Sequence, residues 1–414
     1  MAEQRLKFIV LGAGGRGRHF GGWVADHPDC GEVVAVADPD ATRRDRLCER
    51  CGVAGEMRFE SWEAAMAREK FADVVINTTM DQLHAASAVA ALDRGYHMLL
   101  EKPMATTLAD CEAIDAAQRR SGTVVTVCHS LRYHRSWERI KALVDDGVIG
   151  ELVSFEHLEG VEPIHQSHSF VRGNWGNEGR STFMLMAKSC HDVDVLAWLV
   201  GRRCERVSSF GSLTHFVKAN APKGATAYCL DGCAAERECP YSAMKIYGDD
   251  RLWMAGHADL PADRTARVEV LRTSRYGRCV YDCDNDVVDH QVVSFEFEGG
   301  VTGTFTMTAF APAGRHIRLH GTKGMLRSAA DELRVDVHTY ADGQDQRITL
   351  SEQAGGHGGG DDNVMASLVA AARANDPAAV STTTAESLAS HRVVFAAERA
   401  RREGRVVEIS EVGG

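Results

Sequence analysis

A glycine-rich loop constrains the fold of this chain more than any other feature. The segment Gly12-Ala-Gly14-Gly15-Arg16-Gly17 follows a short apolar run and opens a helix-like pattern. Gly12 permits a tight turn, Gly14 lets the backbone approach a pyrophosphate, and Gly17 lets the helix pack closely on a strand. The free N–H groups and the dipole at the start of the helix attract that anion. The loop therefore predicts a dinucleotide-binding strand–turn–helix unit.

An acidic residue stands where such a unit needs one. Asp38 closes the second apolar run, 21 residues after Gly17. A carboxylate there accepts hydrogen bonds from a ribose 2′-hydroxyl and repels a 2′-phosphate. Arg43 and Arg44 lie too far along the chain to reverse that preference. The sequence therefore favours NAD over NADP as the cofactor.

The first third of the chain alternates apolar runs with helix-like segments. The apolar runs cover residues 6–12, 32–38, 72–79, 97–102 and 124–130. Continuous apolar strands separated by helices are typical of a parallel sheet that is covered on both faces. Residues 1–130 are therefore predicted to form a doubly wound α/β domain of Rossmann type that binds NAD.

From about residue 150 the runs change to an alternation of apolar and polar residues, which is typical of half-buried antiparallel strands. These runs cover residues 152–160, 203–212, 266–273, 290–299, 301–310, 314–322 and 333–340. A helix is expected near 188–200, and Thr383 and Glu386 have the spacing of a capping box that starts another helix. We expect residues 131–414 to form an α+β domain around a large, mostly antiparallel open sheet, which binds substrate and mediates oligomerisation.

The composition excludes several classes of protein. The chain has 47 Lys and Arg against 58 Asp and Glu, a formal charge of −11. Nucleic-acid binders need a surplus of cations to neutralise phosphates. No apolar run approaches the ~18 residues that a membrane span needs, so a soluble, cytoplasmic protein is expected. Most of its 12 cysteines should then be reduced, buried thiols.

Three of those cysteines are clustered in a loop-like insertion at about residues 212–245. Cys229, Cys233 and Cys239 fall within eleven residues, and His215 lies upstream. Three thiolates and an imidazole make a closed, structural zinc site. His257 is an alternative fourth ligand. An iron–sulfur cluster would need a fourth cysteine, which the pair formed by residues 279 and 283 could supply.

Polar residues also follow two later apolar runs of the first domain. Thr79 and His84 flank the end of one run, and Glu101-Lys102-Pro103 ends another. The proline disfavours a helical conformation at Lys102, which holds its side chain at the carboxyl edge of the sheet. Ligands bind at this edge in open α/β folds.

These motifs occur in an order that resembles one known family. GAGGRG, VADPD, TTMDQLH, ALDRGYHMLLEKPMA, LRYH, DDGVIGELV, HDVDVLAWLVG and HGTKG resemble segments of the Gfo/Idh/MocA oxidoreductases over essentially the whole chain. The resemblance implies a Rossmann domain, a second domain with an open sheet and a nicotinamide cofactor. It also implies oxidation or reduction of hydroxyl groups of sugars, inositols and related carbohydrates, and assembly into homodimers or homotetramers through the C-terminal sheet.

The resemblance also implies a catalytic site. In the family, the lysine of Glu-Lys-Pro touches substrate and nicotinamide, and a helix carries Asp and His four residues apart. Lys102 and His191 match this pattern, but Ala187 stands at the Asp position. Lys188 lies three residues before His191, on the same helix face, and is a further acid–base candidate. Asp194, on the other side of His191, is expected to orient its imidazole.

Several other polar residues are candidates for contacts with the substrate. They share positions at strand ends or in loops, and they are Arg132, Tyr133, Asp289, His290 and His357, with Asp284-Asn285-Asp286 nearby. His357 lies in GGHGGGD, where glycines would let the loop fold closely over a ligand. This loop resembles one in NAD-dependent glycosidases that are built on the same fold.

Three functional hypotheses follow. The first is an NAD-dependent dehydrogenase acting on a sugar or glycoside hydroxyl. The second is a glycosidase that retains NAD and cleaves by transient oxidation, elimination, hydration and re-reduction. The third is a non-catalytic NAD-binding regulator, which the polar residues of the second half disfavour.

Overall fold

The computed structural model describes residues 5–249, 252–329, 333–353 and 355–413, and its strands form two sheets. The first sheet is parallel, with strand order β3-β2-β1-β4-β5-β6. Its strands are β1 (Leu6–Leu11), β2 (Gly31–Ala37), β3 (Arg58–Phe59), β4 (Val74–Asn77), β5 (His97–Leu100) and β6 (Val125–Val127). The strand order reverses beside β1, so the predicted doubly wound Rossmann sheet is confirmed.

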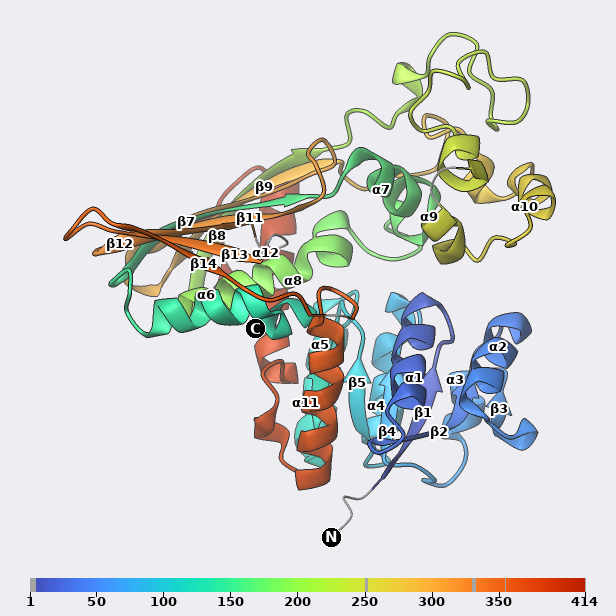
Figure 1. The fold of residues 1–414 in the computed structure, drawn as a ribbon, viewed down its shortest axis with the longest axis horizontal. Helices are drawn as coiled ribbons and strands as arrows, with labels where there is room; N and C mark the ends of the chain where they lie inside the picture. Colours follow the sequence, from blue (N-terminus) through green and yellow to red (C-terminus); the bar gives the residue numbers. More distant parts are fainter. Residues whose placement is uncertain (1–4, 250–251, 330–332, 354, 414) are drawn as a thin grey trace.

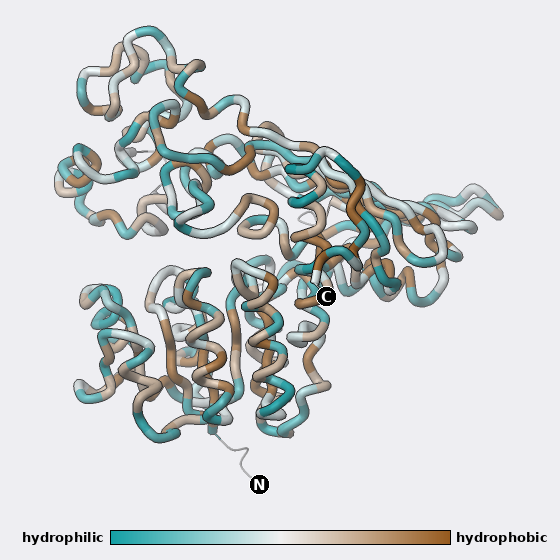
Figure 2. Tube along the Cα trace, turned by 180° about the vertical axis from the view of Figure 1, so that it is seen from behind, coloured by the Kyte–Doolittle hydropathy of each residue, from teal (hydrophilic) through white to brown (hydrophobic). Residues whose placement is uncertain are grey.

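Helices cover both faces of this sheet, because the strands are apolar on both sides and need cover on each. The helices that connect the strands are α1 (Gly15–Asp26), α2 (Ala41–Cys51), α3 (Trp62–Met66), α4 (His84–Leu92) and α5 (Leu108–Ser121). In Figure 2 hydrophobic stretches run through the strands of this lobe and along the helices beside them.

The second sheet has the strand order β14-β13-β12-β11-β7-β10-β9-β8-β15. Its strands are β7 (Leu152–Gly160), β8 (Cys204–Ser212), β9 (His290–Phe297), β10 (Val301–Thr308), β11 (Gly314–Gly321), β12 (Gly324–Ala329), β13 (Arg334–Thr339), β14 (Asp345–Thr349) and β15 (Val407–Glu408). Neighbouring strands are antiparallel except β7 and β10, which run parallel. The predicted large, mostly antiparallel sheet is confirmed.

One face of the second sheet carries helices α6 (Arg135–Asp145), α8 (Met184–Val200) and α12 (Thr384–Glu403) (Figure 1). Phe155 of β7, Phe305 of β10 and Leu196 of α8 belong to the apolar core between sheet and helices. Thr383 and Glu386 form the expected capping box at the start of α12.

The end of the chain returns to the first domain. Helix α11 (Gly360–Ala374) places Val364 and Leu368 in the core that contains Phe8 of β1, and α12 lies beside α5 (Figure 1). The Rossmann domain is therefore covered in part by residues from the far end of the sequence. The proposed division at residue 130 stays a prediction.

The long connection between β8 and β9 packs with α7 (Pro163–Ser167) into a separate lobe. This lobe lies over the first domain, near α1 and α2 (Figure 1). It contains α9 (Leu252–His257) and α10 (Arg264–Leu271). The strand predicted at 266–273 is therefore wrong. Asp263 caps α10 by accepting from Ala266 N, and Arg267 and Leu271 are buried at helical spacing. A short run of alternating apolar and polar residues does not distinguish a strand from a helix, which explains the wrong prediction.

Among the described residues, none of the helices combines the length and apolarity that crossing a membrane requires.

Candidate active site

The glycine loop has the geometry that a dinucleotide needs. Gly12 has φ +89°, and a Cβ there would lie 2.4 Å from Thr78 O, while a Cβ at Gly17 would lie 1.8 Å from Gly12 O. These two glycines are required by close backbone contacts. A Cβ at Gly14 would meet nothing within 4 Å. Gly14 therefore faces open space at the start of α1, beside exposed Gly15, where a pyrophosphate would approach the free N–H groups.

Asp38 is buried at the end of β2 and ties the loop to the strand. One carboxylate oxygen accepts from Ala13 N at 2.6 Å and the other from Asp40 N at 2.8 Å. Arg44 donates to the backbone oxygen of Asp38 at 2.9 Å. The carboxylate therefore lies beside the glycine loop, close to where the adenosine ribose of a bound dinucleotide would be.

Lys102 follows β5 at the carboxyl edge of the sheet. Its Nζ donates to Ala187 O of α8 at 2.8 Å, which links the two domains. Its backbone N donates to Glu101 Oε2 at 2.7 Å. The side chain is half-buried, and its ammonium donates to this backbone carbonyl rather than to a carboxylate.

Arg16 connects the glycine loop to the Lys102 segment and to α11. Its Nε lies 2.5 Å from Glu101 Oε1, and its Nη1 lies 2.8 Å from Asp361 Oδ2. Both carboxylates are buried. Burial alone would raise the pKa of Glu101 and of Asp361, but the Arg16 guanidinium outweighs it and holds both below their usual values. Arg16 therefore fixes the ionised state of both residues.

Asp361 was not among the predicted site residues, although it ends the GGHGGGD motif. Its Oδ2 accepts from His357 Nδ1 at 2.9 Å, and His19 Nε2 lies 3.4 Å away. This carboxylate positions the predicted loop residue His357. The ring of His357 lies 6.4 Å from that of His191, centroid to centroid, so the loop reaches the site.

His191 lies on α8 and is 4% exposed. Burial lowers its pKa well below the ordinary value, and the Lys102 ammonium and Arg315 guanidinium lower it further. Its Nδ1 has no hydrogen-bond partner among the described residues. His191 is therefore a neutral imidazole at pH 7 beside the charge of Lys102, with a ring nitrogen available to a ligand.

Lys188 is paired rather than solvated. Its Nζ lies 2.9 Å from Glu159 Oε1 on β7, and Glu159 is 2% exposed. Arg315 Nε lies 3.1 Å from Glu159 Oε2 and 2.8 Å from Asp192 Oδ1. Lys188 thus belongs to a buried charge network on the sheet side of α8, which the helical spacing alone did not indicate.

The structure places Asp194 and Arg132 in a salt bridge. Arg132 Nε and Nη2 donate to the two Asp194 oxygens at 2.7 and 2.8 Å, and both side chains are buried. Asp194 therefore orients Arg132 instead of His191, and Arg132 joins α8 to the segment before α12 by donating to Ser381 O at 2.7 Å.

Three further predicted residues also make internal contacts. Tyr133 Oη lies 3.2 Å from Thr382 Oγ1, within the first domain's core. Asp289 is fully buried and accepts from His215 N at 2.7 Å and from the ring of His290 at 2.8 Å. Tyr133, Asp289 and His290 therefore each have a partner within the protein.

Thr79 and His84 support the Lys102 segment from the end of β4. His84 is 1% exposed, with Nδ1 at 2.8 Å from Pro103 O and Nε2 at 3.1 Å from Thr79 O. Thr79 is half-buried and donates to Asn77 Oδ1 at 2.9 Å. His84 therefore holds the loop that carries Lys102 rather than facing solvent.

The predicted zinc site is not supported. Within the described ranges, no group of three or more His, Cys, Asp or Glu side chains could hold a metal ion. His215 is fixed elsewhere, because Asp289 accepts from its backbone N–H and its Nε2 lies 3.3 Å from Tyr281 Oη. The side chain of His257 is outside the part that the structure describes.

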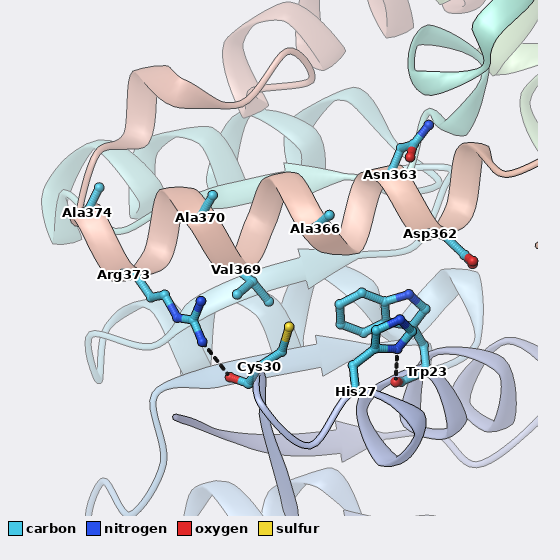
Figure 3. Close-up of a pocket in the computed structure, with 10 residues that line it drawn as sticks. All are labelled: Trp23, His27, Cys30, Asp362, Asn363, Ala366, Val369, Ala370, Arg373 and Ala374. Atoms are coloured by element: carbon cyan, nitrogen blue, oxygen red, sulfur yellow. Dashed lines mark hydrogen bonds between the residues drawn. The ribbon is translucent and has the colours of Figure 1, made fainter. Parts of the chain in front are cut away.

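A surface pocket lies between α1 and α11, lined by Trp23, His27, Cys30, Asp362, Asn363, Ala366, Val369, Ala370, Arg373 and Ala374 (Figure 3). The rings of Trp23 and His27 stack at 4.1 Å on one side of it, and Arg373 donates to Asp29 O at 2.9 Å. Trp23 and His27 come from the C-terminal end of α1, away from the glycine loop at its start. None of the site residues predicted from the sequence lines this pocket.

Comparison with known proteins identifies the family. Residues 6–129 match the Gfo/Idh/MocA oxidoreductase family with its NAD-binding Rossmann fold, and residues 137–327 match the Gfo/Idh/MocA C-terminal domain. The chain belongs to the Gfo/Idh/MocA family. It is an oxidoreductase with an NAD-binding domain at its N-terminal end, as the resemblance of its motifs implied.

Relatives within the Gfo/Idh/MocA family act on varied substrates. YteT of Bacillus subtilis (strain 168), named as an oxidoreductase, is 26% identical over 354 residues, which is 79% of each chain. Inositol 2-dehydrogenase of Salmonella typhimurium is 27% identical over 180 residues, 43% of this chain and 50% of that protein. The match thus covers half of the inositol enzyme.

Solved structures share the fold over nearly the whole chain. Levoglucosan dehydrogenase in complex with NADH has a TM-score of 0.71 at 17% identity, over 98% of this chain and 99% of the other. Aldose-aldose oxidoreductase from Caulobacter crescentus has a TM-score of 0.68 at 19% identity, over 98% and 100%. At these identities the likeness shows the fold alone.

Proposed function

We propose that this protein is an NAD-dependent dehydrogenase that transfers hydride between a carbohydrate hydroxyl carbon and nicotinamide. The observation that carries the proposal is the position of a neutral, buried His191 one helical turn from the carbonyl that binds the Lys102 ammonium, at the carboxyl edge of the Rossmann sheet. The relatives named for inositol and levoglucosan support a polyhydroxylated substrate.

The chain's own residues account for the proton in such a reaction. A hydroxyl must lose its proton as the attached carbon loses hydride, and neutral His191 is the base that takes it. The Lys102 ammonium stabilises the negative charge that develops on the oxygen. NAD, when bound, accepts the hydride and so completes the oxidation of the alcohol to a carbonyl.

Two further residues complete the proposed catalytic group. Lys188, held by Glu159, is next to His191 on α8 and is proposed to pass the proton onward or to bind a second substrate hydroxyl. His357, positioned by Asp361, is proposed to contact substrate from the loop side. Ala187 stands where the family carries Asp, so this chain has no carboxylate at that position. The Lys102 ammonium is therefore not neutralised from position 187, and we propose that its charge acts on the reacting oxygen.

The cofactor preference rests on Asp38. Its buried carboxylate lies at the end of β2, beside Ala13 of the glycine loop. A 2′-phosphate brought to this position would meet a negative charge in a site of low dielectric, whereas a 2′-hydroxyl would donate to it. We therefore propose NAD rather than NADP.

The glycosidase that retains NAD is the second candidate, because the HGGGD loop reaches the site. His357 and His191 lie close enough to act on one sugar, and elimination followed by hydration needs two acid–base groups. Both proposed reactions would use the same residues. They differ in the product: the dehydrogenase releases NADH, whereas the glycosidase re-oxidises it within the catalytic cycle.

One assay separates the hypotheses. The protein is incubated with NAD and, separately, NADP, with a panel of free sugars, inositols and aryl glycosides, while NADH and phenol are measured independently. Net NADH formation supports the dehydrogenase. Phenol release without net NADH supports the glycosidase, and NAD binding with neither product supports the non-catalytic regulator. Faster turnover with NADP would contradict the role of Asp38.

We also propose a homodimer or homotetramer that uses the outer face of the large sheet. Phe210 of β8 and Val292 of β9 are cross-strand partners on the face opposite to the buried core and are 70% and 37% exposed. Exposed apolar residues gathered on one face favour contact with another subunit. Light scattering on the Phe210→Glu variant, compared with the unaltered protein, should show dissociation.

A further inference from the structure

One carboxylate of the lobe between β8 and β9 lies between two arginines of the Rossmann domain. Asp259 Oδ1 is 2.7 Å from Arg18 Nη1 of α1, and Asp259 Oδ2 is 2.9 Å from Arg43 Nη2 of α2. The acid comes from the turn after α9, 241 residues beyond Arg18. The contact lies where Figure 1 shows the lobe close to α1 and α2. Hydride transfer as proposed above makes no use of it.

Both arginines lie in the first turn of a helix that starts at the carboxyl edge of the parallel sheet. Arg18 N donates to Gly14 O of the glycine loop at 2.9 Å. Arg43 N donates at 3.0 Å to Asp40 Oδ1, the cap of α2, and Asp40 N donates in turn to Asp38 Oδ1 at 2.8 Å. Asp259 therefore reaches the end of the cofactor site where a carboxylate meets the adenosine ribose.

Two guanidinium groups on one carboxylate form an anion site. Guanidinium groups bind carboxylates and phosphates with the same planar geometry, so Arg18 and Arg43 are equipped to hold a phosphate as they hold Asp259. Arg43 also has a spare donor, because its Nε has no hydrogen-bond partner among the described residues and lies 3.8 Å from Asp40 Oδ2. An arginine in this region is what accommodates the 2′-phosphate of NADP. The lobe thus fills, with its own carboxylate, a site that suits the group distinguishing NADP from NAD.

The stability of α9 does not account for the charge of Asp259. Leu260 N donates to Ala255 O at 3.0 Å, and Asp259 N donates to Gly256 O at 3.3 Å, which is the pattern of a Schellman motif. Asp259 is the left-handed residue of that motif, with φ +53°. Glycine or asparagine is usual there, and a negative charge at the C-terminal end of a helix is unfavourable. The contacts with the two arginines compensate that charge.

We propose that Asp259 is a specificity-determining residue that excludes the 2′-phosphate of NADP. The inference rests on the proposed function, in which the chain binds NAD through Asp38. Asp38 offers an acceptor to the 2′-hydroxyl, and Asp259 occupies the arginines that a 2′-phosphate would need. The side chain of Asp259 is 25% exposed, so solvent and salt screen its charge less than that of a fully exposed carboxylate. Selection against NADP thus comes from both domains.

The test is the binding of NAD and of NADP to the full-length protein, measured by calorimetry for the unaltered protein and for D259N. Asparagine suits the left-handed backbone and removes the charge, so the fold is kept. D259N should bind NADP about 10–100-fold more tightly than the unaltered protein does, as expected when a hydrogen bond to a charged group is gained, while the Kd for NAD stays within about twofold.

Two further variants show whether the released arginine is responsible. In the double variant D259N/R43M the NADP affinity should return to that of the unaltered protein, because the guanidinium that would hold the phosphate is missing. D282N removes another carboxylate of the same lobe, which pairs with Lys218 at 2.7 Å, and should leave both Kd values unchanged.

The outcomes separate this inference from the proposed function. An unchanged NADP affinity in D259N, or a gain that persists in D259N/R43M, would overturn the role of Asp259 and leave NAD as the cofactor. A loss of NAD affinity in D259N without a gain for NADP would also overturn it, because the contact would then only hold the lobe in place. Tighter binding of NADP than of NAD by the unaltered protein would instead contradict the preference assigned to Asp38, and this inference with it.

Discussion

The side-chain ammonium of Lys102 donates a hydrogen bond of 2.8 Å to the backbone oxygen of Ala187, one turn before His191 on α8. A carbonyl orients the ammonium without neutralising it. The charge therefore acts on its surroundings, and it is one reason why the pKa of His191 lies well below the ordinary value. This contact joins the two domains at the point where we place the reaction.

Replacing Lys102 by Met should lower kcat by about 10²–10⁴-fold, because the charge that stabilises the developing alkoxide is lost. NAD affinity should change little. Lys70→Met is the matched control, since Lys70 also donates to a backbone carbonyl, that of Gly95 at 2.6 Å, but is exposed. Steady-state rates and calorimetric NAD binding measure the two effects. Near-normal turnover by Lys102→Met would remove it from the catalytic group.

The glycine loop gives a pair of contrasting variants. Gly14→Ala adds a Cβ into open space and should leave the melting temperature within a degree or two, yet raise the Kd for NAD about tenfold by obstructing the pyrophosphate. Gly17→Ala brings its Cβ to 1.8 Å from Gly12 O and should destabilise the fold itself. Thermal unfolding with and without NAD checks both, and equal effects on folding would contradict the assignment.

Lys188→Ala should lower kcat about 100-fold, since it removes a proposed acid–base group and leaves Glu159 buried with one cation fewer. Lys188→Arg keeps the charge opposite Glu159 and should preserve folding. The informative measurement is the pH profile of kcat. Loss of an acid–base group would shift the apparent pKa values of this profile, whereas loss of a purely structural lysine would lower kcat at every pH and leave those pKa values unchanged. An unaltered rate for Lys188→Ala would exclude a catalytic role.

Acid sensitivity should depend on a buried histidine. Burial lowers the pKa of His391 to about 3, and its neutral ring accepts from Met104 N and donates to Ser387 O. The unfolded state takes up the proton below about pH 6.5, whereas the folded state resists down to about pH 3. The free energy of unfolding that depends on neutral His391 is therefore at its full value above about pH 6.5 and decreases as the pH falls toward 3.

His391→Gln should make that loss shallower, by about 1.5 kcal/mol between pH 6.5 and 5, where carboxylates titrate little. His316→Gln, at an exposed position, should leave the slope unchanged. Urea unfolding at several pH values measures both. Identical slopes for His391→Gln and the unaltered protein would show that this histidine does not govern acid sensitivity.

Arg16→Met should destabilise the protein by about 3 kcal/mol, the lower end expected when one partner of a buried ion pair is removed, because Glu101 and Asp361 lose their shared cation. Arg50→Met breaks a pair with Asp26 in which both side chains are more than half exposed, and should cost less than about 1 kcal/mol. Denaturant unfolding compares the two. Equal losses would contradict the central place of Arg16.

The sequence by itself determined the architecture, because the patterns involved are local. The glycines at 12, 14 and 17 form one motif of six residues, and the cap at Thr383 needs only the adjoining turn. Alternation between residues 152 and 340 revealed most of the second sheet. It failed at 266–273, where a short alternating run is compatible with the helix that Asp263 caps.

Only the tertiary structure decided which polar residues meet. Arg132 and Asp194 each looked suited to the site, but they lie 62 residues apart and satisfy each other in the core. Asp361 reaches Arg16 across 345 residues of sequence. A buried charge takes the best partner that the packed chain brings near it, and spacing along the sequence carries no information about that partner.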